Sequence, residues 1–380
     1  MTRRWGPWIA STIGVALVTA AAGLARNPVF QGADPHAMMI DGEMWIFPTG
    51  GPGGSWAADR FGAFSSRDLK TWTSRGEIMR RDQIRWIGDD GAKAHFLWAP
   101  GVATRDGKWY LYYSVGPQNP TPSRIGVAVA DAPQGPYRDS GRPLVTGGRQ
   151  ANGEFEAIDP MAFVDPRSGK AYLYAGGSAG AKLRIWELSR DLVSLAREVP
   201  VHQPPNFTEG AFMHERNGVY YLSYSHGHWN GPDYSVHYAT APSPIGPWRY
   251  RGAILTSNTR HQGPGHHSFV RTPQDEWLIV YHRWDQPPGP APLKGERQVA
   301  IDRVCYGTDG TIVPVIMTEG DAVPKLHGIG NCASNQRLGG CPSSGRTATH
   351  AARRANADGR LSTSFASKQT SRSAPLLDSR

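Results

Sequence analysis

The chain has 380 residues, of which 19% are charged, and it contains 45 glycines, 31 prolines, 13 tryptophans and 14 tyrosines. This composition favours many short strands and turns, and the lack of a long stretch with helical apolar spacing argues against a helical bundle. The net charge of +9 comes from Arg3, Arg4 and the residues after 324, so residues 26–324 are neutral and show no basic footprint for nucleic acid.

Residues 1–25 have the pattern of an export signal. Arg3 and Arg4 precede an apolar run at residues 9–22, and small residues at its end offer cleavage sites. The run is at the short limit for crossing a bilayer, which makes a retained membrane anchor the less favoured alternative. We therefore expect a secreted or periplasmic protein with no stable membrane insertion after the signal is cleaved.

One pattern then recurs five times, at intervals of 50 to 66 residues. Each unit has a polar or small anchor residue, an apolar strand, a tight turn and an aromatic strand. The Asp-Gly pairs at 41–42 and 106–107 and the Asn-Gly pair at 217–218 predict hairpins, because these residues accept positive φ. The anchors are Asp34, Pro100, Asp159, Glu209 and His266.

A second strand pair follows each hairpin, so each unit has the four strands of a propeller blade. Residues 26–324 are therefore predicted to form an all-β, five-bladed β-propeller. Residues 27–30 and 297–315 would close the ring. An irregular pair of β-sandwiches is the alternative.

Three of the anchors are acids, at Asp34, Asp159 and Glu209. The innermost strand of every blade lines the axis of a propeller, so we expect the three carboxyl groups to meet there. Hydrolysis of a glycosidic bond needs two carboxyl groups in opposite protonation states, and a third can raise the pKa of the acid. Taken singly, each acid could be a turn or strand-start residue, but their shared register favours catalysis.

The segment after the repeats, residues 325–380, is predicted to be a basic, disordered tail. It has nine Lys or Arg and two Asp, and no helical or strand period. Cys332 and Cys341 could close a small loop after export. We expect Cys305, in a strand-like run before the tail, to be a buried free thiol.

Five motifs between residue 27 and about residue 324, "NPVFQGADP", "WAPGV", "AIDPMAFVD", "FTEGAFM" and "GPGHHSFV", resemble those of glycoside hydrolase family 43. The resemblance implies an inverting mechanism. It implies that Asp34 is the general base, Glu209 is the general acid, and Asp159 modulates the pKa of the acid and positions it. It also implies a carbohydrate substrate from plant cell walls, such as a xylo- or arabino-oligosaccharide.

Three further site residues are predicted, Trp98 from its axis-facing position in the second blade and the other two from the same resemblance. Trp98 could pack against a sugar face or merely pack at the rim. Arg297, in "GERQVAID", resembles an arginine that reaches the sugar, with an exposed salt-bridge arginine as the alternative. His266 matches a histidine that approaches a Ca²⁺ ion held mostly by water, and a metal-free, hydrogen-bonding histidine is the alternative.

The substrate is not fixed by the spacing of the motifs. Two long loops, at residues 79–97 and 226–234, favour a closed pocket and hence an exo-acting β-xylosidase or α-L-arabinofuranosidase in xylan degradation. A retaining hydrolase of the fructan or sucrose type is one alternative. A non-catalytic carbohydrate-binding propeller is the other.

Overall fold

The computed structural model describes residues 27–50, 56–150, 153–178 and 180–320. The chain divides after Cys332 into two units, and all described residues belong to the first. The predicted export signal and the predicted tail lie outside the described residues and stay predictions. Within the described ranges, no helix has both the length and the apolar character needed to cross a membrane.

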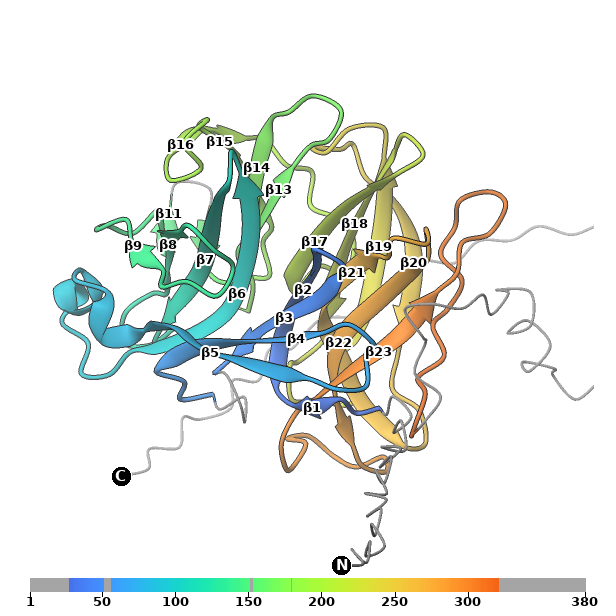
Figure 1. Cartoon of the computed structure of the whole chain (residues 1–380). Helices are drawn as coiled ribbons and strands as arrows, with labels where there is room; N and C mark the ends of the chain where they lie inside the picture. Colours follow the sequence, from blue (N-terminus) through green and yellow to red (C-terminus); the bar gives the residue numbers. More distant parts are fainter. Residues whose placement is uncertain (1–26, 51–55, 151–152, 179, 321–380) are drawn as a thin grey trace, which may run out of the picture. The chain divides into compact units, whose positions relative to one another are not determined.

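Five antiparallel sheets surround one axis, and each has four strands in line from the axis outward (Figure 1). The innermost strands are β2 (Ala33–Ile40), β6 (Phe96–Arg105), β13 (Met161–Val164), β17 (Glu209–Arg216) and β21 (His261–Arg271). The second strands are β3 (Glu43–Thr49), β7 (Lys108–Gly116), β14 (Ala171–Ala175), β18 (Val219–His226) and β22 (Trp277–Asp285). The third strands are β4 (Arg60–Ser66), β8 (Arg124–Ala130), β15 (Arg184–Leu188), β19 (Ser235–Ala241) and β23 (Gln298–Val304). The outermost strands are β5 (Thr73–Arg80), β10 (Val145–Thr146), β16 (Leu195–Val199), β20 (Arg249–Leu255) and β1 (Phe30–Gln31).

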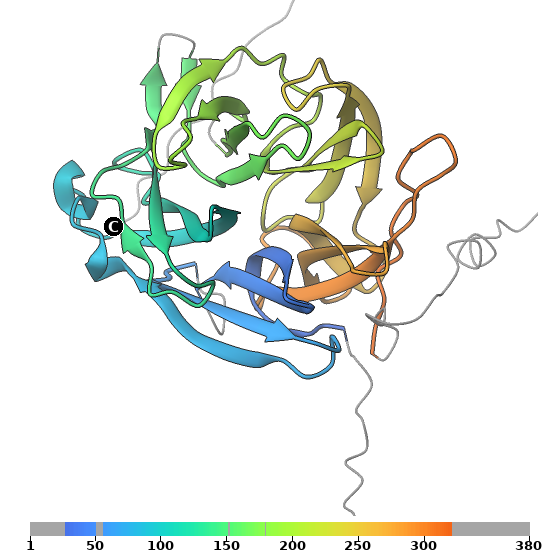
Figure 2. The same ribbon diagram turned by 45° about the horizontal axis from the view of Figure 1, so that its top comes forward.

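The innermost strands contact one another in a closed ring, in the order β2, β6, β13, β17, β21 and back to β2. Figure 2 shows this ring of blades from a second direction. The predicted five-bladed β-propeller is therefore confirmed, and the β-sandwich alternative is wrong. Among the described residues, five short elements stand outside the pattern: β9 (Arg138–Asp139) beside β8, the hairpin of β11 (Gly148–Gln150) and β12 (Gly153–Phe155), and the 3₁₀ turns η1 (Arg81–Gln83) and η2 (Ile87–Asp90).

The tight turns form where the sequence predicts them. At positions 41–42, 106–107 and 217–218, both residues have positive φ, between 48° and 83°. Each turn joins the first two strands of its blade. The second strands are covered on both faces by neighbouring blades, so their sequences are continuous aromatic and apolar runs. In β7, for example, no side chain from residue 110 to residue 115 is more than 8% exposed.

The N-terminal strand closes the ring, as predicted. Strand β1 pairs with β23, with Phe30 opposite Val299 and Gln31 opposite Gln298. Asn27 stabilises this closure through two hydrogen bonds to one residue of β23. Its side chain donates to the carbonyl of Ile301 (2.9 Å) and accepts from the N–H of the same residue (3.0 Å). The last blade is thus made from both ends of the described chain.

A buried carboxyl group, Asp302, lies beside this closure. It accepts hydrogen bonds from the hydroxyls of Tyr281 (2.7 Å) and Thr318 (2.6 Å) and from the side chain of Asn27 (3.4 Å). Burial raises the pKa of Asp302 to about 6, although Thr318, Tyr281 and Arg283 act in the opposite direction. The closure therefore contains a group whose charge is costly in the folded state.

Cys305 is disulfide-bonded, so the prediction of a free thiol is wrong. The other cysteines, Cys332 and Cys341, lie outside the described residues, and so does the loop predicted between them. Three cysteines allow several pairings, and their spacing along the chain cannot rank these pairings.

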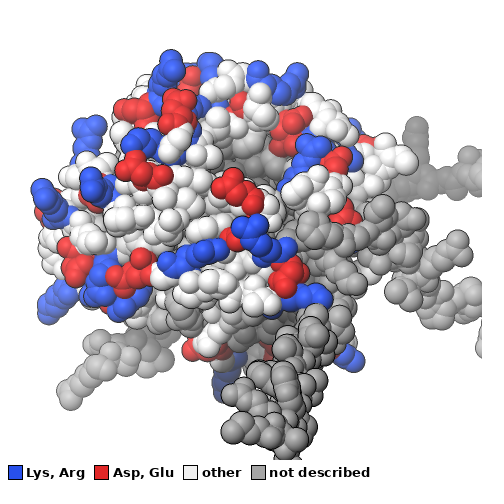
Figure 3. Space-filling model, in the orientation of Figure 1, with Lys and Arg blue, Asp and Glu red and all other residues white. Residues whose placement is uncertain are grey.

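Charged side chains are interspersed on the surface. On the face drawn in Figure 3, Lys and Arg lie among Asp and Glu. This distribution fits the neutral balance of residues 26–324.

Candidate active site

Each blade has a residue with left-handed backbone geometry at the equivalent position, within its innermost strand or, in the third blade, two residues before it. These residues are Asp34 (φ 48°), Ala99 (φ 47°), Asp159 (φ 56°), Gly210 (φ 61°) and His266 (φ 41°). In four blades a β-bulge accompanies this residue, and a bulge re-aims a side chain relative to a regular strand. Left-handed geometry is strained for residues other than glycine, and such strain clusters at functional sites.

The predicted register is therefore right for Asp34, Asp159 and His266, but it is one residue off in two blades. The equivalent positions there are Ala99, not Pro100, and Gly210, not Glu209. The same bulge is present in the blades of Asp34 and His266, so the offset comes from the choice of Pro100 and Glu209 as anchors and not from the bulge. Glu209 nevertheless reaches the same axial pocket from the position before the left-handed residue.

The backbone N–H of four left-handed residues donates to a side chain at the end of the second strand of the preceding blade. The pairs are Ala99 with Thr49 Oγ1 (2.7 Å), Asp159 with Ser114 Oγ (2.9 Å), His266 with Ser225 Oγ (2.8 Å) and Asp34 with His282 Nδ1 (3.2 Å). These bonds hold the strained residues in place and join consecutive blades around the axis.

The fifth position breaks the pattern. The residue at the equivalent position is Gly176, directly after β14, and a Cβ there would lie 1.9 Å from the carbonyl oxygen of Lys182. No side chain is available, so the N–H of Gly210 donates instead to Asp159 Oδ2 (3.1 Å). This bond draws the carboxyl group of Asp159 toward the blade that carries Glu209.

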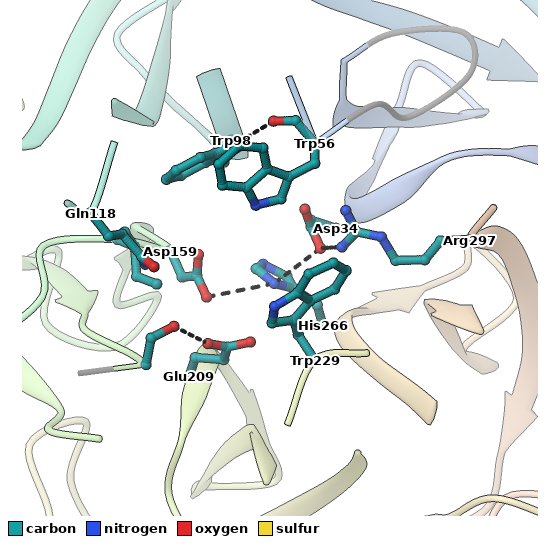
Figure 4. Close-up of a pocket in the computed structure, with 11 residues that line it drawn as sticks. Asp34, Trp56, Trp98, Gln118, Asp159, Glu209, Trp229, His266 and Arg297 are labelled. Atoms are coloured by element: carbon teal, nitrogen blue, oxygen red, sulfur yellow. Dashed lines mark hydrogen bonds and ion pairs between the residues drawn. The ribbon is translucent and has the colours of Figure 1, made fainter. Parts of the chain in front are cut away.

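One pocket, with an empty volume of about 480 Å³, contains all six predicted site residues (Figure 4). The three acids are buried there, with exposed fractions of 6–7%. The predicted residues that line it are Asp34, Trp98, Asp159, Glu209, His266 and Arg297.

Asp34 lies beside a guanidinium, a hydroxyl donor and two imidazoles, and His282 accepts the backbone N–H of Asp34 through Nδ1. Its Oδ1 is 2.8 Å from Arg297 Nη1, 3.3 Å from His282 Nδ1 and 3.4 Å from His266 Nδ1, and its Oδ2 accepts from the hydroxyl of Thr49 (2.7 Å). Burial alone would raise the pKa of Asp34, but Arg297, His266 and His282 outweigh burial and hold that pKa well below its ordinary value. Asp34 is thus an ionised carboxylate at neutral pH.

The pKa of Asp159 is shifted in the opposite direction from that of Asp34. Burial, and then the negative charges of Glu209 and Asp34, raise its pKa well above the ordinary value. Its Oδ2 is also 3.6 Å from His266 Nδ1, so the imidazole lies between Asp34 and Asp159. Because neighbouring buried carboxyl groups cannot all ionise, the protonated form of Asp159 is favoured while Asp34 is charged.

Glu209 is held through both of its carboxyl oxygens. Oε1 accepts from the hydroxyl of Tyr234 (2.8 Å), and Oε2 accepts from the hydroxyl of Ser178 (3.0 Å). Ser178 lines the pocket, whereas Tyr234 is fully buried beneath it. The two oxygens of Glu209 therefore face different surroundings.

Aromatic rings stand around the three acids. In Figure 4, Trp56 and Trp98 lie on one side of the pocket and Trp229 lies across from them. The ring centroids of Trp56 and Trp98 are 5.2 Å apart, and Trp98 donates to the carbonyl of Trp56 (2.6 Å). The guanidinium of Arg297 lies 5.2 Å from the ring centroid of Trp229. Arg297 is thus a buried partner of Asp34 and not an exposed salt-bridge arginine.

The predicted calcium site receives no direct support from the described residues, which contain no group of three or more His, Cys, Asp or Glu able to hold a metal. Ca²⁺ takes six to eight oxygen ligands. The carboxylates beside His266 are already bonded to Thr49 and Arg297 on Asp34 and to the N–H of Gly210 on Asp159. A calcium ion held mostly by water next to His266 stays a prediction.

Sequence reasoning missed several residues of the site. Trp56 follows the Gly-rich stretch at 50–54, which reads as a turn, and Trp229 lies in a loop that was expected only to wall the pocket. We find no signal in the sequence for Gln118, Ser178 or the buried Tyr234. The additional lining residues are Trp56, Gln118, Ile158, Ser178 and Trp229.

A five-bladed propeller with carboxyl groups of opposite ionisation at its axis defines a class of enzymes that cleave glycosidic bonds. The model of the family described as glycosyl hydrolases family 43 matches residues 25–312. The chain belongs to this family and is a glycoside hydrolase.

Several known proteins are similar to this chain. The β-D-galactofuranosidase xynD of Aspergillus niger is 35% identical over 315 residues, which cover 77% of this chain and 86% of that protein. An α-L-arabinofuranosidase of Clostridium thermocellum has a TM-score of 0.59 and 32% identity, covering 76% of this chain and 95% of that chain. CoXyl43, a β-xylosidase/α-arabinofuranosidase from a compost microbial metagenome, is in complex with xylotriose in a calcium-free form. It has a TM-score of 0.59 and 29% identity, covering 76% of this chain and 97% of that chain.

Proposed function

We propose that this enzyme is an inverting, exo-acting glycosidase in which Asp34 is the general base, Glu209 is the general acid and Asp159 modulates the acid. The observation that supports these roles is the opposite ionisation of the acids. The pKa of Asp34 is held well below its ordinary value, while the pKa of Asp159, next to Glu209, is raised well above its own. Hydrolysis with inversion requires such a pair.

On the base side, Asp34 takes a proton from a water molecule while the water oxygen attacks the anomeric carbon. Thr49 and Arg297 fix the carboxylate through both oxygens, so it has a defined direction toward the water. His282 donates nothing to the sugar in this scheme. It accepts the N–H of Asp34 and fixes the backbone.

On the acid side, Glu209 gives its proton to the leaving oxygen as the bond between that oxygen and the anomeric carbon breaks. The electron pair of that bond stays on the leaving oxygen. Asp159 favours the protonated form of Glu209, because two adjacent buried carboxyl groups repel each other when both are charged. The hydrogen bond from Gly210 holds Asp159 in that place.

We propose a terminal α-L-arabinofuranosyl or β-D-xylosyl residue as the sugar that is released. Relatives named α-L-arabinofuranosidase and β-xylosidase/α-arabinofuranosidase support this choice. A terminal β-D-galactofuranosyl residue is the second candidate, because a relative of that activity is 35% identical. β-D-galactofuranose has the ring stereochemistry of α-L-arabinofuranose and carries one additional hydroxymethyl group.

Exo action is supported by two loops, one of which lines the pocket while the other packs behind the aromatic ring of Trp56 at its edge. In the loop at residues 79–97, Asp90 hydrogen-bonds His95 (2.8 Å) and forms an ion pair with Arg124 (2.8 Å), so the loop is tied to β8. Its end brings Phe96 against Trp56, with the ring centroids 4.8 Å apart. The loop at residues 226–234 supplies Trp229. A walled pocket accepts one end of a chain more readily than its middle.

Rates on nitrophenyl α-L-arabinofuranoside, β-D-xyloside and β-D-galactofuranoside, and on the matching oligosaccharides, test the proposal. We expect one of these sugars to be cleaved, and Asp34→Ala and Glu209→Ala to lose that activity. Catalysis that survives in Asp34→Ala would reject its role. An inactive wild type on every pentoside and polymer would favour a carbohydrate-binding protein.

The stereochemistry is tested separately by NMR of the anomer that is released first. We expect inversion, and a retained anomer would instead support the mechanism of the fructan- and sucrose-type hydrolases. Export is also part of the proposal. N-terminal sequencing of protein recovered outside the cytoplasm should give a start near residue 26, and an intact Met1 on that protein would contradict cleavage.

A further inference from the structure

We propose that Tyr234 is a positioning residue that directs the acid proton of Glu209 to Oε2, the oxygen that faces the pocket. This inference rests on the proposed function, in which Glu209 is the general acid. Tyr234 is fully buried and does not line the pocket, so it acts through Glu209 and does not touch the sugar.

Hydrogen bonds run in one direction from the axis to Glu209. The backbone N–H of His266 donates to Ser225 Oγ (2.8 Å), Ser225 donates to the phenol oxygen of Tyr234, and Tyr234 donates to Glu209 Oε1 (2.8 Å). Each hydroxyl has one hydrogen, and the first bond of the chain comes from a backbone N–H that can only donate. The hydrogen of the Tyr234 hydroxyl therefore points at Oε1.

Tyr234 keeps this hydrogen across the working range of pH. Burial, and then the charges of Glu209 and Asp159, raise its pKa well above the ordinary value of a tyrosine. It is thus a permanent donor to Glu209 and cannot compete with it as an acid.

The ring of Tyr234 is packed in a fixed position between neighbouring residues. It stacks on the imidazole of His282, with centroids 5.8 Å apart and planes 8° from parallel. On the strand of the neighbouring blade, Gly265 leaves room for the ring, because a Cβ at Gly265 would lie 2.1 Å from Tyr234 Cε1. The glycine before His266 in the "GPGHH" motif thus makes room for the residue that orients the acid.

The consequence is an assignment of the proton. An oxygen that accepts the Tyr234 hydrogen bond is poorly placed to carry a proton of its own, so the proton of the neutral acid is on Oε2. Oε2 lies 3.0 Å from the hydroxyl of Ser178, which lines the pocket. A serine hydroxyl rotates freely, so it donates to Oε2 when Glu209 is ionised and accepts from Oε2 when that oxygen carries the proton. When substrate binds, the leaving oxygen takes the place of Ser178 and receives the proton as its bond to the anomeric carbon breaks.

The test compares substrates with good and poor leaving groups in the full-length enzyme. In Tyr234→Phe we expect kcat/KM on the natural disaccharide or the phenyl glycoside to fall about tenfold to hundredfold, the effect of one hydrogen bond to a charged group. On the 2,4-dinitrophenyl glycoside, whose leaving group needs little protonation, the rate should stay close to that of the wild type. The alkaline limb of kcat/KM should move to higher pH, because a donor to the carboxylate is lost.

Tyr112→Phe is the matched control. Tyr112 is also fully buried, and its hydroxyl donates to the carbonyl of Leu192 (2.6 Å), outside the pocket. We expect this variant to have wild-type rates on both substrates. If Tyr234→Phe does not fold, Ser225→Ala removes the donor to Tyr234 and should produce the same leaving-group dependence with a smaller amplitude.

Two outcomes would overturn the inference: an equal loss on both substrates, or no loss on the poor substrate. Glu209→Gln separates this failure from failure of the proposed function. If Glu209→Gln keeps its activity on the disaccharide, Glu209 is not the acid and the proposed function fails. If Glu209→Gln shows leaving-group dependence and Tyr234→Phe shows none, only the role of Tyr234 is wrong.

Discussion

Replacing Arg297 by methionine should move the acid limb of the pH profile to higher pH. The limb of kcat/KM at low pH reports protonation of the base in the free enzyme, which we propose to be Asp34. Arg297 is the largest of the groups that favour the charged form of this carboxylate. Without the guanidinium, Asp34 stays buried and loses its main counter-charge, so it takes up a proton at a higher pH.

The size of the shift follows from the geometry. Arg297 Nη1 is 2.8 Å from Asp34 Oδ1, and both side chains are only 9% exposed, so solvent screens the pair weakly. Charge centres about 4 Å apart interact by about 4 kcal/mol at an effective dielectric constant near 20, which corresponds to roughly three pKa units. His266 and His282 remain in the variant, and water can enter the vacated space. We therefore expect a shift of about one to two units.

The assay is kcat/KM of Arg297→Met and wild type between acidic and neutral pH, on whichever nitrophenyl glycoside the wild type cleaves. Arg303→Met is the matched control. Arg303 forms an ion pair of the same length, 2.8 Å, with Glu276, and neither residue lines the pocket. An acid limb that does not move in a folded Arg297→Met enzyme would refute the view that Arg297 sets the ionisation of Asp34.

Three further predictions concern single residues. In Asp159→Asn, the alkaline limb of kcat/KM should move to lower pH, because a neutral amide no longer repels the carboxylate of Glu209; an unmoved limb would remove Asp159 from its modulating role. The folded-state pKa of Asp302 is about 6 against an ordinary 3.8, so this group lowers stability as the pH rises through that interval. Asp302→Asn should therefore reduce the loss of unfolding free energy between pH 4 and pH 7 by up to about 3 kcal/mol in denaturant titrations, and identical pH dependence in both proteins would contradict this. In Trp56→Ala we expect KM to rise about threefold to tenfold with little change in kcat, because the ring lines the pocket but bonds none of the acids; an unchanged KM would show that it does not contact the sugar.

The repeat in the sequence was sufficient to predict the propeller, because each hairpin is specified locally. Asp-Gly and Asn-Gly turns and aromatic second strands mark the blades, and their order determines which strands face the axis. Asp34 and Asp159 could be brought together by this reasoning alone. The bulge at Glu209 could not be predicted, since it depends on how β17 pairs with β18 and not on the residues of either strand alone.

The repeat contains one further signal in the sequence. The ends of the second strands align as Thr49, Ser114, Gly176, Ser225 and His282, so the exceptional glycine is visible in the repeat. It shows that the blade before Glu209 lacks a side-chain acceptor. The effect of Gly176, however, depends on the tertiary structure, in which the N–H of Gly210 donates to Asp159 in place of a side chain at position 176. Tyr234 has no such repeat partner, and its role depends on the tertiary fold.

The pairing of β1 with β23 has a consequence for how activity arises during synthesis. Phe30 can pair with Val299 only after almost the whole propeller has been synthesised. Asp34 lies in the first blade, and Arg297 lies directly before β23, the last described strand along the chain. A nascent chain can therefore form the ion pair between Asp34 and Arg297 only at the end of synthesis. A fragment ending short of β23 would hold all three acids yet form no working centre.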